Sequence, residues 1–343
     1  MVHDEPYLAV LSRRELIKQS AALAILALPF PLPGFPKNRT MRDSTNFDVI
    51  IVGGSYSGLA AGLTLGRSLK SVLIIDSGLP CNRQTPHSHN FLTQDGNMPK
   101  EIAMVAKQQV AAYDTIHFYN GVATHGAKTE KGFEIQTSAG ESFKAKKLIF
   151  ATGVRDLVPE VRGYGECWGI SLLHCPYCHG YEVRGKKTAV IGNGEYGFEF
   201  ASLISNWTSN LTLLTNGLST LTQEQMALLK KHKIEVIEKE IARLEHKHGY
   251  LGTILFGDGS GFPLEVAYTR VPFEQNCTIP SNLGCELSEE GYIKVDAFQK
   301  TNVDGVFASG DSVTRLRTVA NAVAMGTTAG MMANRELVFE QFN

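Results

Sequence analysis

The chain has 343 residues, of which 20% are charged and 43% hydrophobic, and this composition is typical of a folded globular protein. Lysine and arginine (33 residues) nearly balance aspartate and glutamate (34), so the charge gives no indication of a nucleic-acid partner. The length exceeds that of a usual single domain and suits two domains.

The N-terminal segment resembles a targeting signal. Arg13 and Arg14 stand before an apolar stretch, as in the twin-arginine export signal of bacteria. Because this stretch is short and interrupted by prolines, we expect no stable membrane span. Residues 1–45 are therefore interpreted as a signal and linker, which predicts a periplasmic protein. If translation instead starts at Met41, the protein is expected in the cytoplasm.

A first βαβ unit follows this segment. The apolar run Val49–Val52 predicts a buried parallel strand, Ala60–Leu69 a helix, and Leu73–Ile75 a second strand that ends at Asp76. A carboxylate at the end of the second strand is typical of dinucleotide-binding units, where it contacts a ribose.

The glycine turn of this unit departs from the usual G-x-G-x-x-G pattern. Gly53 and Gly58 occupy the first and last positions, but Ser55 stands where the middle glycine belongs. The serine is tolerated if the pyrophosphate lies slightly further out, and its hydroxyl can donate to a phosphate. Together with the strand before it and Asp76 after it, the turn indicates a nucleotide site.

A second unit later in the chain carries the complete pattern. Gly192, Gly194 and Gly197 directly follow another apolar strand. Two such units in one chain predict two nucleotides, one a flavin dinucleotide and the other a nicotinamide dinucleotide.

A C-x-x-C pair, Cys175 and Cys178, lies just before the second unit and is followed by His179. A structural zinc site needs a second pair at similar spacing, which the chain lacks, so no metal is predicted. The C-x-x-C-H pattern of Cys175–His179 also matches c-type haem attachment. Its position between two nucleotide-binding units disfavours haem. A redox disulfide facing a flavin remains, because cysteines at this spacing close a small loop that is readily reduced and re-formed.

The remaining cysteines are interpreted as free thiols, with a Cys277–Cys285 bridge as the alternative; they are Cys81, Cys167, Cys277 and Cys285.

Near the C-terminus a predicted strand ends at Gly310 and Asp311 and leads into a helix of small residues. The start of this helix offers backbone N–H groups and a dipole that suit a phosphate or an electron-rich ring edge. Asp311 is expected to accept from a sugar-chain hydroxyl, or else to be an ordinary capping residue.

These motifs, taken in order, resemble the low-molecular-weight thioredoxin reductase family of FAD-dependent disulfide oxidoreductases. The resemblance runs from Phe47 to the C-terminus and includes the sequences FATG at Phe150–Gly153 and GVFASGD at Gly305–Asp311. It implies an α/β fold with two Rossmann-like dinucleotide-binding domains and a homodimer. The FAD-binding domain would be discontinuous (46–157 and 273–343), with an inserted NAD(P)-type domain (158–272) that carries the C-x-x-C pair.

The resemblance also implies which residues act. Cys178 would attack the flavin, Cys175 would exchange with the substrate, and His179 would donate and accept protons, unless it is merely a solvated or capping residue. His87, His89 and Asn90 stand where the FAD-domain loop of the family approaches the flavin, although an ordinary polar loop is the alternative. The residues expected to bind the two cofactors are Gly53, Ser55, Gly58, Asp76, Ser77, Gly78, Asn90, Thr152, Gly153, Gly310, Asp311, Thr318, Val319 and Ala320 for FAD, and Gly192, Gly194 and Gly197 for NAD(P)H.

Three departures from the family pattern bear on the direction of electron flow and on nucleotide preference. His179 replaces the aspartate that usually follows the second cysteine, and Cys178–Glu182 (CHGYE) resembles the branch that contains fungal dithiol oxidases. Leu213–Gly217 has no Arg or Lys where the family usually holds the NADP 2′-phosphate, which places NADPH preference in question.

The predicted function is a reductase in which NAD(P)H reduces FAD, FAD reduces the disulfide, and the dithiol reduces a thioredoxin-like protein or a small-molecule disulfide. The alternative is a dithiol oxidase whose flavin is reoxidised by oxygen. A third possibility is a flavin-binding sensor without turnover.

Overall fold

The structure, a computed structural model, describes residues 45–342. Its largest sheet has the strand order β3-β2-β1-β6-β5-β4, with β17 beside β6. The strands are β1 (Asn46–Val52), β2 (Val72–Asp76), β3 (Ile116–Asn120), β4 (Ala123–Thr129), β5 (Gly132–Thr137), β6 (Ser142–Phe150) and β17 (Val306–Ala308).

The centre of this sheet is parallel and buried on both faces. β1 pairs in parallel with β2 and with β6, and β17 continues the parallel arrangement on the other side of β6. Alternate side chains of β1 enter two separate cores, Ile50 in one and Ile51 in the other. A continuous apolar run is what a strand in this position requires, which explains why the predicted strand was recognisable.

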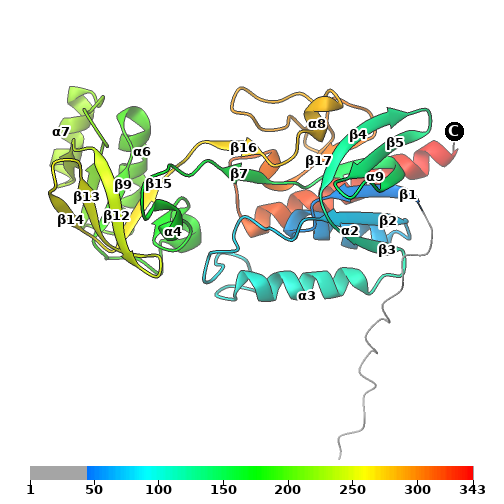
Figure 1. Ribbon diagram of the computed structural model, residues 1–343, viewed down its shortest axis with the longest axis horizontal. Helices are drawn as coiled ribbons and strands as arrows, with labels where there is room; N and C mark the ends of the chain where they lie inside the picture. Colours follow the sequence, from blue (N-terminus) through cyan, green and yellow to red (C-terminus); the bar gives the residue numbers. More distant parts are fainter. Residues whose placement is uncertain (1–44, 343) are drawn as a thin grey trace, which may run out of the picture. The chain divides into compact units, whose positions relative to one another are not determined.

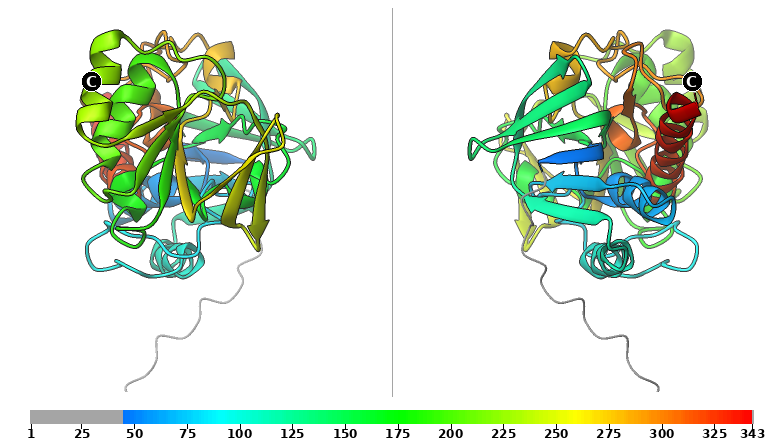
Figure 2. Two further views of the ribbon diagram at one scale, coloured as in Figure 1. Left: turned by 90° about the vertical axis from the view of Figure 1, so that its left-hand side faces the viewer. Right: turned by 90° about the vertical axis from the view of Figure 1, so that its right-hand side faces the viewer.

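Helices α2 (Tyr56–Arg67), α3 (Pro99–Ala111) and α9 (Val319–Phe342) contribute to the core on one face of this sheet. α2 and α9 lie side by side (Figure 2) because small residues line their contact. A Cβ on Gly326 would lie 2.0 Å from the carbonyl oxygen of Ser57, so only glycine allows this approach. α2 begins earlier than the predicted Ala60–Leu69, because the glycine turn leads directly into the helix.

A second sheet has the order β11-β10-β9-β15-β8 and is entirely parallel. Its strands and the helices beside them are β8 (Leu172–Leu173), β9 (Thr188–Ile191), α6 (Gly194–Ile204), β10 (Leu211–Leu214), α7 (Gln223–Lys231), β11 (Glu235–Ile237) and β15 (Val266–Thr269). An antiparallel three-stranded sheet interrupts it in sequence, formed by β12 (Ile241–Lys247), β13 (Tyr250–Phe256) and β14 (Gly261–Pro263).

Two short antiparallel strands, β7 (Val154–Asp156) and β16 (Phe273–Gln275), connect the sheets (Figure 1). The chain leaves the first sheet through β7, builds the second, and returns through β16 to add β17 to the first. The predicted α/β fold with two Rossmann-like units is thereby confirmed. The domain boundaries at 157/158 and 272/273 stay a prediction, although they lie next to these connecting strands.

Short helical segments complete the described chain: α4 (Tyr164–Cys167), α5 (Pro176–His179), α8 (Ile279–Asn282) and the 3₁₀ turn η1 (Gly310–Ser312). Within residues 45–342, no helix is both long enough and apolar enough to cross a membrane. The predicted export signal lies outside the described residues.

Candidate redox active site

A disulfide joins Cys175 and Cys178 across the single turn of α5. Cys175 is the N-cap residue and Pro176 occupies the first helical position, where its missing N–H leaves no donor unsatisfied. The N–H of Cys178 donates to Cys175 Sγ at 3.2 Å, and both cysteines are half-buried. One helical turn thus brings the two sulfurs together, as the spacing predicted.

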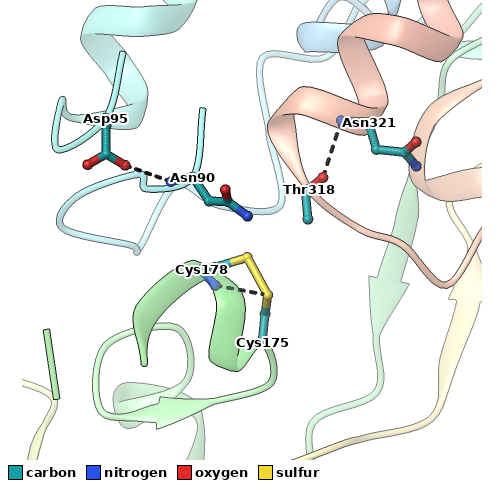
Figure 3. The surroundings of a disulfide bond; sticks show 6 residues. All are labelled: Asn90, Asp95, Cys175, Cys178, Thr318 and Asn321. Carbon is teal, nitrogen blue, oxygen red and sulfur yellow. Dashed lines mark hydrogen bonds between the residues drawn. A yellow bond between two sulfur atoms is a disulfide. The ribbon is translucent and has the colours of Figure 1, made fainter. Parts of the chain in front are cut away.

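The disulfide faces two residues that the sequence assigns to the flavin site (Figure 3). Asn90 comes from the loop before α3 and has a left-handed backbone with φ of +58°. Its N–H donates to Asp95 Oδ1 at 2.7 Å, which fixes the loop. Thr318 lies directly before α9, where its hydroxyl accepts from the N–H of Asn321 at 3.2 Å. The structure therefore brings predicted cofactor-binding residues to the redox pair.

Two histidines flank the disulfide in sequence. Burial, reinforced by the charges of His174 and His89, lowers the pKa of His179 to about 4. Burial and the nearby Arg317 cation likewise lower the pKa of His174 to about 4. Both imidazoles are therefore neutral at neutral pH, and burial disfavours their protonated forms. His174 was missed by the sequence reasoning, although its place directly before Cys175 was a usable indication.

His89 of the predicted flavin-approach loop lies against His179. Its ring meets that of His179 at a right angle, with centroids 6.4 Å apart. Its Nδ1 lies 3.6 Å from Glu182 Oε1 and 3.7 Å from Asp95 Oδ1. His87, by contrast, is exposed and bonds the carbonyl oxygen of Gly96.

The first glycine turn requires its glycines. Gly53 has φ of +104°, and a Cβ there would lie 2.2 Å from the carbonyl oxygen of Ala151. A Cβ on Gly58 would lie 1.8 Å from the carbonyl oxygen of Gly53. Ser55 is the N-cap of α2, yet its side chain makes no capping hydrogen bond, so donors at the helix start are left for a ligand.

The ends of neighbouring parallel strands gather the other predicted FAD-side residues. Asp76 ends β2 and accepts from the N–H of Gly54 at 3.1 Å, and Ser77 and Gly78 follow it. Thr152 and Gly153 follow β6, and Gly310 follows β17. Such an edge is where open α/β sheets bind nucleotides.

A buried hydroxyl without a hydrogen-bond partner among residues 45–342 lies at this edge, where a bound dinucleotide could satisfy it. The hydroxyl oxygen of Thr152 is buried and has no hydrogen-bond partner within the described chain. Asp311 is partly buried, with a side chain 18% exposed. Desolvation raises the pKa of its carboxyl, and its Oδ2 lies 3.6 Å from Arg317 Nε. Val319 and Ala320 open α9 beside them. Polar groups in these positions suit the ribityl and phosphate oxygens of FAD.

In the second glycine turn, the side chain of Asn193 accepts a hydrogen bond from a backbone N–H of the turn. Asn193 caps α6 and its Oδ1 accepts from the N–H of Gly194 at 2.8 Å and from the N–H of Thr220 at 2.8 Å. Its amide group donates to the carbonyl oxygen of Leu218 at 2.8 Å. The loop after β10 is thereby tied to the turn formed by Gly192, Gly194 and Gly197, which was not foreseen.

The remaining cysteines are free thiols in the structure: Cys81, Cys167, Cys277 and Cys285. Among the described residues, no group of three or more His, Cys, Asp or Glu side chains is arranged to hold a metal ion.

Comparison with known proteins gives consistent matches over nearly the whole described chain. The pyridine nucleotide-disulphide oxidoreductase family matches residues 47–326. The thioredoxin reductase tcpT of Claviceps purpurea is 33% identical over 312 residues, covering 87% of this chain and 96% of that protein. The thioredoxin reductase sirT of Leptosphaeria maculans is 30% identical over 306 residues, covering 84% of this chain and 93% of that protein. The crystal structure of an oxidoreductase from Agrobacterium tumefaciens is similar with a TM-score of 0.80 and 36% identity, covering 86% of this chain and 99% of that one.

Proposed function

We propose that this chain, which belongs to the pyridine nucleotide-disulphide oxidoreductase family, carries electrons from NAD(P)H through FAD to the Cys175–Cys178 disulfide and on to a substrate disulfide. The predicted family and the thioredoxin reductase-like enzyme class are confirmed by the family match and the relatives. The electron route is our proposal. The observation that carries it is the disulfide on α5, which faces Asn90 and Thr318 of the flavin side.

FAD and NAD(P)H are the cofactors of thioredoxin reductases and their relatives. When bound, FAD supplies a centre that exchanges two electrons with a dithiol. The residues that would hold it are those at the carboxyl ends of β1, β2, β6 and β17, together with the start of α9. Gly53 and Gly58 allow the close backbone approach of the turn beside which the pyrophosphate would lie, and Thr152 would use its orphaned hydroxyl.

Residues of the chain would donate and accept the protons that accompany reduction of the disulfide. Reduction breaks the Cys175–Cys178 bond and takes up two electrons and two protons, which leaves two thiols. His179 directly follows Cys178, and in this proposal it exchanges a proton with the Cys178 thiol. Its lowered pKa means that the imidazole is neutral before this exchange and returns the proton readily. In this proposal Cys178 faces the flavin and Cys175 exchanges with the substrate.

A dithiol oxidase is the second candidate, and the second glycine turn favours it. Asn193 already engages the N–H groups of Gly194 and Thr220, which are donors of the kind a pyrophosphate uses. Leu213–Gly217 has no Arg or Lys for a 2′-phosphate. In this route a substrate dithiol loses two electrons and two protons and becomes a disulfide, and oxygen accepts them as hydrogen peroxide.

The partner, assembly and location remain proposals. We propose a thioredoxin-like protein or a small-molecule disulfide as substrate, consistent with the names of the relatives tcpT and sirT. We further propose a homodimer, which light scattering tests, and export through Arg13 and Arg14. A lysine pair at those positions should retain the protein in the cytoplasm, and unchanged export would contradict that route.

The test is an anaerobic titration of the flavin-loaded protein with NADH, then NADPH, then dithiothreitol, followed at the visible flavin band. Bleaching by either nucleotide supports the reductase. Bleaching by dithiothreitol alone, with peroxide formed in air, supports the oxidase. If none of the three reagents bleaches the flavin, both candidates are wrong.

A further inference from the structure

We propose that Asp156, Arg317 and Trp168 form a positioning network that holds the His174–Cys175 segment toward the flavin-binding residues. This inference rests on the proposed function, because it assigns these residues to electron exchange between the disulfide and the flavin. We expect them to act on the disulfide through the segments that they hold.

The first link is a buried ion pair. Arg317 Nη1 and Nη2 donate to the two carboxylate oxygens of Asp156 at 2.8 Å and 3.0 Å, in a bidentate arrangement. The side chains are only 14% and 12% exposed, so the pair is weakly screened by solvent. Arg317 directly precedes Thr318, which faces the disulfide (Figure 3). The ion pair therefore ties the loop before α9 to β7, the connecting strand that ends at Asp156.

The second link runs from the same carboxylate toward the disulfide. Trp168 Nε1 donates to Asp156 Oδ2 at 3.3 Å. The indole stacks on the imidazole of His174, with centroids 5.7 Å apart and planes 25° from parallel. His174 is bonded through the backbone to Cys175. One carboxylate thus receives hydrogen bonds from the flavin-side loop and from the residue that packs against the disulfide segment.

Arg317 also links the network to Asp311, one of the residues predicted to bind FAD. Arg317 Nε is buried without a hydrogen-bond partner within the described chain and lies 3.6 Å from Asp311 Oδ2. One cation therefore faces two partly buried carboxylates, those of Asp156 and Asp311. Cys81 Sγ lies 3.7 Å from the same Asp311 oxygen. Asp156 has two possible roles, to neutralise Arg317 or also to hold Trp168. If it only neutralises Arg317, removing the indole donor of Trp168 should leave electron exchange unchanged.

The decisive variant is Trp168→Phe, which keeps an aromatic ring for His174 but removes the indole donor. Asp156→Asn is the second variant, because it keeps an acceptor for Trp168 but loses the charge that pairs with Arg317. Arg155→Gln is the matched control: it breaks an exposed ion pair with Glu274 on the same β7–β16 ribbon. All three are compared with the unaltered protein as flavin-loaded enzymes.

Three quantities are measured on each protein. The first is the melting temperature. The second is the rate at which iodoacetamide alkylates Cys175 and Cys178, measured by mass spectrometry. The disulfide is first reduced with a phosphine, and the phosphine is removed before alkylation. The third is the rate and dithiothreitol dependence of anaerobic flavin bleaching.

We expect Trp168→Phe to melt close to the unaltered protein, to be alkylated several-fold faster, and to bleach about tenfold more slowly at saturating dithiothreitol with an unchanged half-saturating concentration. Asp156→Asn should show the same changes together with a lower melting temperature, and Arg155→Gln should show none. Unchanged alkylation and bleaching in Trp168→Phe would overturn the proposal. If the unaltered protein is not bleached at all, the proposed function fails, and the alkylation rates alone then decide whether the network holds the segment.

Discussion

The two glycine turns share a sequence pattern but differ in what engages their backbone donors. In the first, Gly54 follows Gly53, and the helix start has no side-chain cap. In the second, Asn193 follows Gly192, and its side chain takes the N–H groups of Gly194 and Thr220. The residue after the first glycine thus decides whether a side chain engages the N–H at the helix start: Asn193 does so, and Gly54 has no side chain to do so.

This difference has a simple physical origin. Asparagine is among the most favourable N-cap residues because its amide oxygen accepts an otherwise unpaired N–H of the first helical turn. The same bond that stabilises α6 removes a donor from any incoming nucleotide. A nucleotide at the second turn must displace Asn193 or bind around it, whereas at the first turn no such exchange is needed.

The largest effect is expected at the first turn. Gly58→Ala would place a methyl group 1.8 Å from the carbonyl oxygen of Gly53, so the turn must open. We expect loss of bound flavin and destabilisation by about 3 kcal/mol or more, measured by the flavin-to-protein absorbance ratio and by denaturant unfolding. Gly165→Ala, where a Cβ meets nothing within 4 Å, is the control and should keep its flavin. Full flavin content in Gly58→Ala would show that this turn is not the flavin site.

The corresponding change at the second turn separates the two sites. A Cβ on Gly197 would lie 2.8 Å from the backbone carbonyl of Gly192, so the turn is distorted but less severely. We expect Gly197→Ala to keep its flavin and to lose NAD(P)H-dependent bleaching by about tenfold or more. Dithiothreitol-dependent bleaching serves as the internal control and should be unchanged. Equal losses with both reductants would mean that the second turn affects the flavin itself.

Asn193→Ala tests whether the cap competes with the nucleotide. Removing the amide frees the N–H groups of Gly194 and Thr220 and should tighten NADH binding several-fold, measured by titration calorimetry. The lost cap should lower the free energy of unfolding by about 1 kcal/mol. Asn193→Asp is the matched comparison: it keeps an acceptor and adds a negative charge, and it should weaken NADH binding. If both variants bind NADH like the unaltered protein, the cap does not obstruct the site.

The smallest effect is expected for nucleotide preference. Leu218 is 83% exposed in the loop after β10, and its side chain can be replaced without breaking a hydrogen bond. Leu218→Arg adds a cation where the chain lacks one and should improve NADPH binding by a few-fold while leaving NADH binding unchanged. Leu218→Gln controls for the change in polarity. An equal gain for both nucleotides would indicate general electrostatic attraction rather than contact with the 2′-phosphate.

The sequence was most informative where a local pattern decides the structure. β1 and β2 were recognisable because a parallel strand buried on both faces is continuously apolar. The disulfide was recognisable because one helical turn brings Cys175 and Cys178 together. The strand ends that carry Asp76 and Gly310 were also predicted from the local sequence, whereas Thr152 came from the resemblance of FATG to the family.

The features that were missed depend on residues far apart in the chain. Nothing near Arg317 in sequence indicates Asp156, and nothing near Asn193 indicates that Thr220 returns to it. No sequence motif includes Trp168, and its role follows only from its stacking on His174. Such contacts are set by how the sheets are connected, which spacing along the chain does not encode.

The most direct test of electron passage between flavin and disulfide is to count and map the thiols formed on reduction. The anaerobic, flavin-loaded protein is treated with one equivalent of NADH, and a second sample with NADPH, and each is then alkylated under denaturing conditions and analysed by mass spectrometry. The account predicts two new alkylated positions, Cys175 and Cys178, with the larger yield from the preferred nucleotide, and none in Cys175→Ser. A flavin that bleaches while Cys175 and Cys178 stay joined would contradict it.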